Sequence, residues 1–199
     1  MVDNVWKLYD KHAAAFDKTR DRSFMERPYL ETLANSIASG GCVLDLGCGM
    51  GEPIAKYFID AGYRVTGVDA APAMLAICRA RWPDGGWIEA DMRALDLGRR
   101  FDAIVAWDSF FHLAASDQRT MFARFAAHAA PGARLLFTSG LAAGKAIGDL
   151  FGDTLYHASL DPDEYRALLA DAGFRVLRFT PEDPECGGHS VWLAAFDGN

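Results

Sequence analysis

Short apolar runs alternate with helical patterns along most of the chain. Five runs are nearly continuous in apolar residues, as in parallel strands that helices cover on both faces. They are Cys42–Leu46, Arg64–Val68, Gly86–Ala90, Ala103–Trp107 and Ala133–Thr138. Helical patterns separate them, over Pro53–Ala61, Pro72–Arg81 and Ser116–His128. This alternation predicts an α/β fold with a doubly wound, mostly parallel sheet and helices on both faces.

The last third of the chain follows a different pattern. A helix is predicted to begin after Asp161 and to end at Gly173, where a glycine suits a helix end. Two strand candidates follow, Phe174–Thr180 and Ser190–Phe196, and only PEDPECGGH joins them. Because a crossover helix does not fit in so short a connection, this pair is predicted to be antiparallel. The sheet thus has seven predicted strands, with one antiparallel strand near its C-terminal edge.

Two segments lie outside the alternation. Residues 1–40 have the apolar spacing of two helices and form a predicted N-terminal helical cap. Residues 139–159 carry glycines four positions apart, an arrangement that suits either close helix packing or a mobile loop. We favour a lid or a substrate-side insertion for this segment. With no linker and no repeat in the sequence, residues 1–199 are predicted to be a single domain.

Composition narrows the class of protein. The chain has 199 residues, of which 51% are hydrophobic and 24% charged, which is typical of a globular protein. The net charge of −7 argues against a nucleic-acid substrate, because phosphates need a basic surface. The N-terminus lacks the apolar core of a signal peptide, and no apolar run approaches a membrane span. We therefore expect a cytoplasmic protein that binds neither membrane nor nucleic acid.

The four cysteines have no spacing typical of a disulfide framework, so reduced thiols are expected. Cys186-Gly-Gly-His189 looks like half of a metal site. Since no second CxxC or CxxH pair accompanies it, no metal is predicted.

The stretch VLDLGCGMGEP, residues 43–53, joins the first predicted strand to a helix through a glycine-rich loop. A phosphate-binding P-loop is excluded because the motif GxxxxGK[ST] is absent, and no lysine follows a glycine within this loop. The dinucleotide fingerprint GxGxxG requires its last glycine where this chain has Glu52, whose charge would repel a pyrophosphate. Asp45 before the loop instead suits a ligand with an ammonium group. Asp69, which ends the second strand, suits a ribose, although it is also placed to cap the next helix.

Six segments together resemble the class I S-adenosylmethionine-dependent methyltransferases of the small-molecule type. The segments are VLDLGCGMG, VTGVDAAPAML, IEADMRAL, FDAIVAWDSFFHL, PGARLLFTSG and DEYRALLADAGFRVL, in the family's order and over nearly the whole chain.

The resemblance implies a binding role for eleven residues. The methionyl end of the cofactor is expected near Asp45, Gly47, Gly49 and Gly51, the ribose near Asp69 and Ala70, the adenine near Asp91 and Met92, the sulfur near Trp107, and the carboxylate near Tyr9 and Arg20. Alternatives remain for three of them. Asp91 also suits an exposed turn, Met92 core packing, and Arg20 a solvated helix end.

The implied activity is transfer of a methyl group from S-adenosylmethionine to an oxygen, nitrogen or sulfur of a small molecule, by in-line displacement, with S-adenosylhomocysteine as product. In this family substrate modules lie at the N-terminus or after the fifth strand; the segments here, before Cys42 and after Thr138, are short and favour a small acceptor. Asp108, His112, His157 and His189 are candidate bases, although His112 suits a structural role better. The aromatic candidates for pocket walls are Trp6, Phe110, Phe111, Phe151 and Tyr156. The alternatives are a nicotinamide-dependent oxidoreductase and a catalytically silent cofactor-binding module.

Overall fold

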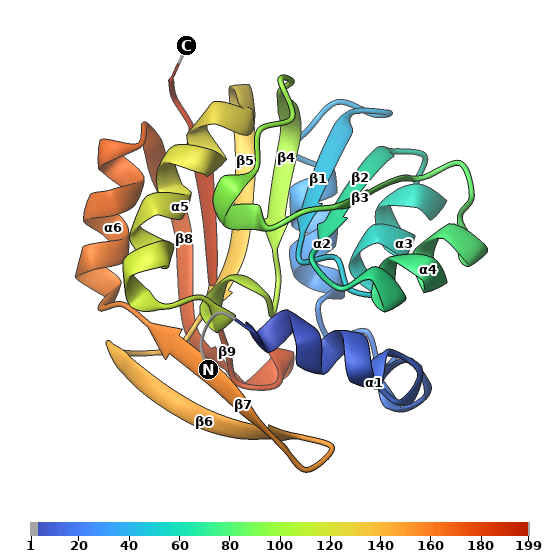
Figure 1. Cartoon of the computed structure of the whole chain (residues 1–199). Helices are drawn as coiled ribbons and strands as arrows, with labels where there is room; N and C mark the ends of the chain where they lie inside the picture. Colours follow the sequence, from blue (N-terminus) through green and yellow to red (C-terminus); the bar gives the residue numbers. More distant parts are fainter. Residues whose placement is uncertain (1–3, 199) are drawn as a thin grey trace.

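A seven-stranded sheet forms the centre of the computed structural model, which describes residues 4–198 (Figure 1). The strand order is β3-β2-β1-β4-β5-β9-β8, and β9 runs antiparallel to both of its neighbours. This confirms the predicted fold. The strands are β1 (Cys42–Leu46), β2 (Arg64–Asp69), β3 (Gly86–Glu89), β4 (Phe101–Ala106), β5 (Ala129–Ser139), β8 (Phe174–Asp183) and β9 (His189–Phe196).

Helices cover both faces of the sheet and form a separate hydrophobic core with each. One core packs α5 (Ala115–His128) and α6 (Pro162–Asp171) on the sheet. The other packs α2 (Arg27–Ala34), α3 (Ile54–Asp60) and α4 (Pro72–Arg81). Neighbouring strand residues alternate between the two cores, so that Val43 enters one and Leu44 the other. Burial on both faces explains why β1 and β4 are apolar at almost every position.

The segment after β5 differs from the prediction. Residues 139–159 were expected to form a loop or lid, and the structure instead has a β-hairpin of β6 (Gly144–Leu150) and β7 (Asp153–Ser159). Phe151 and Gly152 form its turn, both with positive φ, at 53° and 89°. Such turns match the twist of a hairpin, but they usually contain asparagine or glycine at the first position. A role as a lid remains a prediction.

The N-terminal cap consists of α1 (Val5–Thr19) and α2, while residues 1–3 of the predicted cap lie outside the described part of the chain. Figure 1 shows α1 and the hairpin at the same edge of the sheet. Val5 on α1 packs with Leu155 and Tyr156 of β7, and Ala13 packs with Met50 and Met74. Within residues 4–198, no helix is long and apolar enough to cross a membrane.

An aromatic cluster fills the core beneath α5 and α6. Phe110 is completely buried, with ring centroids 5.6 to 6.2 Å from those of Phe122, Phe125, Phe137 and Tyr165. The prediction that Phe110 lines a pocket is therefore wrong, because its ring is enclosed by other side chains. Its burial makes it a determinant of stability.

We expect Phe110→Ala to lower the free energy of unfolding by about 3–5 kcal/mol, because it removes a ring and leaves a cavity in a close-packed core. Urea unfolding followed by circular dichroism measures this loss. The control is Phe151→Ala in the hairpin turn, whose side chain is 45% exposed and whose removal should cost about 0.5 kcal/mol or less. Equal losses of unfolding free energy for the two variants would contradict the conclusion that Phe110 is a core residue.

Candidate functional site

A cavity of about 340 Å³ lies beyond the carboxyl ends of β1, β2 and β4. In doubly wound sheets this is the place where ligands bind, because the chain leaves neighbouring strands in opposite directions. Residues of α1, β7 and β9 complete its wall. The predicted site residues that line the cavity are Tyr9, Arg20, Asp45, Gly47, Gly49, Asp69, Ala70, Asp91, Met92, Trp107, Asp108, His112, His157 and His189.

The three glycines of the loop have different surroundings. At Gly47 (φ 73°), a Cβ atom would lie 2.3 Å from the Cβ of Ser109, so a side chain does not fit. Around Gly49 (φ 53°), no atom lies within 4 Å of the place a Cβ would take, and its bare backbone faces the cavity. Gly51 is not among the lining residues, and a Cβ there would lie 2.7 Å from the ring of Trp82. The structure thus brings Gly47 and Gly49 to the site and places Gly51 against α4.

The carboxylate of Asp69 joins the loop to the start of α4. Its Oδ2 accepts a hydrogen bond from the backbone of Gly49, and its Oδ1 accepts one from the backbone of Ala71, each at 2.8 Å. Each carboxylate oxygen has a second lone pair. Asp69 therefore holds the loop and the residue that precedes Pro72. It does not cap the helix, because the N-cap residue of α4 is Ala71 and no side chain caps the helix there. Its role toward a ribose stays a prediction.

Asp45 is a buried carboxyl group with an unused oxygen. The residue is 2% exposed, and its Oδ2 has no hydrogen-bond partner among the described residues. Burial, with a smaller contribution from the charge of Asp69, raises the pKa of Asp45 to about 8. Leaving such a group unpaired is costly, and a cationic donor would relieve that cost.

Asp91 and Met92, the two residues predicted to lie near the adenine, have different surroundings. Asp91 lines the cavity, but its carboxylate binds the guanidinium of Arg93 at 2.6 Å, and this contact lowers the pKa of Asp91. Arg93 also contacts Asp117, at 3.0 Å. The methyl group of Met92 lies 3.3 Å from the position of a Cβ on Gly47, so Met92 packs against the glycine loop.

His112 is held in one tautomer by two hydrogen bonds. Its Nδ1 lies 2.9 Å from the carbonyl oxygen of Tyr156, which can only accept, so Nδ1 carries the proton. Its Nε2, 3.0 Å from the hydroxyl of Tyr9, then accepts from that hydroxyl. Burial lowers the pKa of His112 to about 4, which agrees with a neutral ring. The stretch that contains it is a single 3₁₀ turn, Phe110–His112.

His189 and Asp108, which also line the cavity, form an ion pair. Nε2 of His189 lies 2.9 Å from Oδ1 of Asp108, and Nδ1 lies 2.6 Å from the carbonyl oxygen of Cys186. Since both partners accept, both ring nitrogens donate, and His189 is an imidazolium whose pKa is raised by Asp108. Arg20 adds a second cation, 4.0 Å from Asp108 and 3.0 Å from the buried Glu26.

His157 lies between the cavity and the hairpin. Its ring centroid is 4.8 Å from that of His112 and 5.3 Å from that of Phe111, and burial lowers its pKa. Trp6 and Phe111 line the cavity as predicted, whereas Tyr156 and Phe151 do not.

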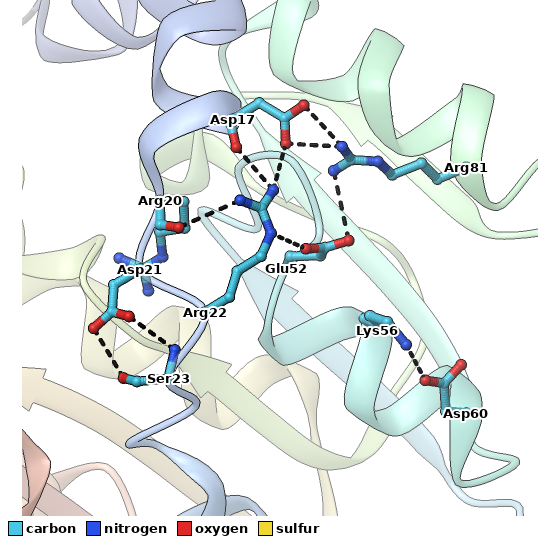
Figure 2. Close-up of polar contacts among 9 residues, drawn as sticks. All are labelled: Asp17, Arg20, Asp21, Arg22, Ser23, Glu52, Lys56, Asp60 and Arg81. Atoms are coloured by element: carbon cyan, nitrogen blue, oxygen red, sulfur yellow. Dashed lines mark hydrogen bonds and ion pairs between the residues drawn. The ribbon is translucent and has the colours of Figure 1, made fainter.

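Four charged side chains connect the N-terminal segment to the glycine loop and α4 (Figure 2). Asp17, at the end of α1, contacts Arg22 at 3.1 Å and Arg81 at 2.8 Å. Glu52 contacts the same two arginines, at 2.9 Å and 3.7 Å. The carboxylate that argued against a dinucleotide is therefore paired, and it helps to attach α1 over the cavity.

Sequence reasoning missed Ser109 and the role of Asp10. Ser109 Oγ donates to the carbonyl oxygen of Leu46, at 2.6 Å, and packs against Gly47. Oδ1 of Asp10 accepts from the backbone of Ala73, at 2.7 Å, and so attaches α1 to the first turn of α4. Neither contact has a local signal, because each joins residues more than 60 positions apart.

Comparison with known proteins shows which proteins this chain is similar to. Residues 43–132 match the family model described as a methyltransferase domain. The dTDP-3-amino-3,6-dideoxy-alpha-D-glucopyranose N,N-dimethyltransferase of Streptomyces fradiae is 38% identical over 91 residues. That alignment covers 45% of this chain and 35% of the relative, so the chain matches about a third of the curated relative's length.

Two solved structures share the fold over nearly their whole length. The S-adenosylmethionine-bound amino pentose methyltransferase of Micromonospora echinaspora has a TM-score of 0.72 at 21% identity, covering 94% of this chain and 96% of that one. The 1,6-didemethyltoxoflavin-N1-methyltransferase of Burkholderia thailandensis, solved with its substrate and S-adenosylhomocysteine, has a TM-score of 0.73 at 24% identity, covering 96% and 88%. The chain therefore has the class I methyltransferase fold. Residues 43–132, which carry the first four motifs, match the family model of a methyltransferase domain.

We expect Arg22→Gln to speed amide hydrogen exchange in α1, because the ionic network that attaches this helix loses its central cation. Exposed ion pairs contribute up to about 1 kcal/mol, so the expected change is roughly fivefold. Exchange followed by mass spectrometry measures it. Arg27→Gln is the control, since it removes an exposed ion pair with Glu31 within α2. Unchanged exchange in α1 would show that the network does not hold the helix.

Proposed function

We propose that this protein transfers a methyl group from S-adenosylmethionine to a nitrogen, oxygen or sulfur atom of a small molecule. One observation carries the choice of donor. The buried Asp45 has an unpartnered oxygen in the same cavity as the bare backbone of Gly49. A carboxyl group in this position favours a ligand with a positive charge and disfavours a pyrophosphate.

The residues present fit this cofactor. Asp45 is assigned to its ammonium group, Asp69 to the ribose hydroxyls, and Met92 to a face of the adenine. The cationic groups of Arg20 and His189 are assigned to the carboxylate end. The cofactor supplies a methyl group already activated by a sulfonium centre. The chain's contribution is therefore to hold donor and acceptor in line and to exclude water, which accounts for roughly 7–11 kcal/mol in well-oriented reactions.

Where the acceptor must lose a proton, we assign that proton to His157. The Nε2 lone pair of His112 is occupied by the hydroxyl of Tyr9, and both nitrogens of His189 already donate. A lowered pKa keeps the ring of His157 neutral at neutral pH, with a lone pair available. Asp108 is paired with His189 and is assigned the role of holding that imidazolium.

The enclosure of the site supports a small acceptor. Helix α1 packs on the rest of the protein through Val5, Tyr9 and Ala13. It also contacts the hairpin through Lys11 and His12, which both lie 2.6 Å from Asp153. We infer that α1 and the hairpin together form the cover of the cavity. The relatives named above act on an aminosugar and on didemethyltoxoflavin, which are small molecules.

Binding of the cofactor product should release a proton from Asp45. With its pKa raised to about 8, this carboxyl group is mostly protonated at neutral pH, and an ammonium group beside it favours the ionised form. Affinity for S-adenosylhomocysteine is therefore expected to rise with pH between about 6 and 8, by up to roughly tenfold per unit. Calorimetry in two buffers of different ionisation enthalpy measures the proton release. Asp45→Asn should abolish it and Asp60→Asn, an exposed site on α3, should preserve it; release that persists in Asp45→Asn would refute the assignment.

The proposed function is tested by titration with S-adenosylhomocysteine and, separately, with NAD. Binding of the first and none of the second is expected. Tight NAD binding without binding of S-adenosylhomocysteine would instead establish an oxidoreductase. Incubation with methyl-labelled cofactor and a metabolite panel then separates an enzyme from a silent binding module, in which label never reaches an acceptor.

A further inference from the structure

The outer edge of strand β6 has no partner strand among the described residues. The hairpin is a sheet of two strands, in which β6 pairs with β7 alone. Figure 1 shows β7 between β6 and the rest of the protein, and five of the seven residues of β6 are exposed. An exposed edge strand offers a row of backbone N–H and C=O groups to another strand.

Contacts of β7 establish which of its backbone groups point away from β6. The carbonyl oxygen of Tyr156 lies 2.9 Å from Nδ1 of His112, and that of Ala158 accepts from the side-chain amide of Gln118, at 2.8 Å. In an antiparallel pair, residues directly opposite each other either exchange hydrogen bonds or both direct their N–H and C=O groups away from the pair. Tyr156 and Ala158 are of the second kind.

The residues of β6 opposite these two therefore also present their backbone outward. Ile147 is opposite Tyr156, and Lys145 is opposite Ala158. Asp149 lies two residues further along the strand, so its backbone has the same orientation. The two-residue turn agrees with this alternation, because the residues on either side of such a turn are hydrogen-bonded to each other.

The side chains at the same three positions share one face of β6. They alternate with Ala146 and Gly148, so they lie on the face opposite to that of His157. The side chain of Ile147 is 67% exposed.

Exposed apolar side chains are concentrated in this part of the chain. Besides Ile147, Leu141 and Phe151 are exposed, and these three are among only four large hydrophobic side chains that are exposed within residues 4–198. An apolar group on a free strand edge indicates a contact with another chain.

The sequence of β6 is complementary to itself when two copies run antiparallel. With Ile147 opposite Ile147 of the second copy, Lys145 of each copy lies opposite Asp149 of the other. All of these positions present their backbone outward, so each pair can also exchange hydrogen bonds. A register shifted by one residue loses those hydrogen bonds, and one shifted by two leaves the charged side chains without opposite charges.

Both charges are available for such a contact. Within residues 4–198, neither Lys145 nor Asp149 forms an ion pair, and the carboxylate of Asp149 accepts only from the backbone of Gly152, at 3.0 Å. Opposite charges directly across a strand pair are stabilising, whereas like charges are destabilising. Charge complementarity therefore selects a second copy of this chain as the partner and selects one register for it.

We propose that two copies of this chain form a dimer by antiparallel pairing of β6 with β6 of the second copy. The two hairpins then make one sheet of four strands, with the Ile147 side chains beside the two-fold axis and a Lys145–Asp149 pair on either side of it. Each copy uses the same surface, so the assembly closes at two copies. This interface is independent of the function proposed above, and it joins the two hairpins that cover the cavities.

Charge reversal tests the interface, with sedimentation velocity of the whole protein over a range of concentrations as the measurement. The unmodified protein should form a dimer. Lys145→Asp places two acids opposite each other, and Asp149→Lys places two lysines opposite each other, so each variant alone should associate roughly tenfold or more weakly. An equimolar mixture of the two variants should regain the dimer, because every cross-strand pair again has opposite charges. The control is Arg100→Asp, an exposed site in the loop before β4, which makes the same change in net charge as Lys145→Asp and should leave association unchanged.

Three results would overturn the interface: a monomer at every concentration, a dimer that both single variants leave intact, or folded variants whose mixture does not regain the dimer. Circular dichroism establishes that the variants are folded.

Amide hydrogen exchange of the unmodified protein tests the same pairing without any substitution. Exchange at Lys145, Ile147 and Asp149, whose N–H groups face outward, should slow as the protein concentration rises. Exchange at Ala146 and Gly148, whose N–H groups face β7 in either state, should change less. Nitrogen-15 NMR resolves this alternation, and rates at the three outward positions that do not depend on concentration would refute the pairing.

Discussion

The reversal of strand order between β1 and β4 is the constraint on which the site depends. Because β2 lies on one side of β1 and β4 on the other, the segments that follow these strands diverge and leave a crevice. The loop after β1 can remain in that crevice only with a backbone free of side chains, which Gly47 and Gly49 supply. Asp69 then fixes the loop through the backbone of Gly49, so the crevice and its ligand groups are established by the same few contacts.

Burial of charge gives this crevice its chemical selectivity. Asp45 and Asp69 both lie near strand ends, and within residues 4–198 no lysine or arginine is seen to bind either carboxyl group. Burial raises both pKa values. Two buried acids are unfavourable in the free protein and become favourable beside a cation or hydroxyl donors. On the other wall, Asp108 is already neutralised by His189 and Arg20. The site thus has one end where unpaired acids favour a cation, and another where Arg20 and His189 supply cationic donors beside Asp108 and Glu26. This distribution suits a zwitterionic ligand.

The sheet could be predicted from the sequence because its signal is local. Each central strand is buried on both faces, so runs such as Cys42–Leu46 are apolar without interruption, and the glycine loop follows directly. The hairpin could not be predicted, since its glycines hide the alternation of β6 and its turn places a phenylalanine at positive φ. Among the residues that line the cavity, Gly47, Gly49 and Asp69 were predicted from motif spacing, whereas Gly51 lies against Trp82 instead. The hydrogen bond from Tyr9 to His112 joins residues 103 positions apart, and only the fold brings them together.

The contacts of the histidines determine their roles more than their positions in the sequence do. His112, His157 and His189 all face the same cavity, yet hydrogen bonds hold His112 as a neutral ring and His189 as a cation. A neutral ring that already accepts from a tyrosine positions that tyrosine, and a cation paired with Asp108 contributes charge. The remaining ring, His157, lies in the wall of the cavity beside the ring of His112. The proposed proton acceptor therefore lies on the hairpin, the part of the fold whose structure the sequence pattern did not reveal.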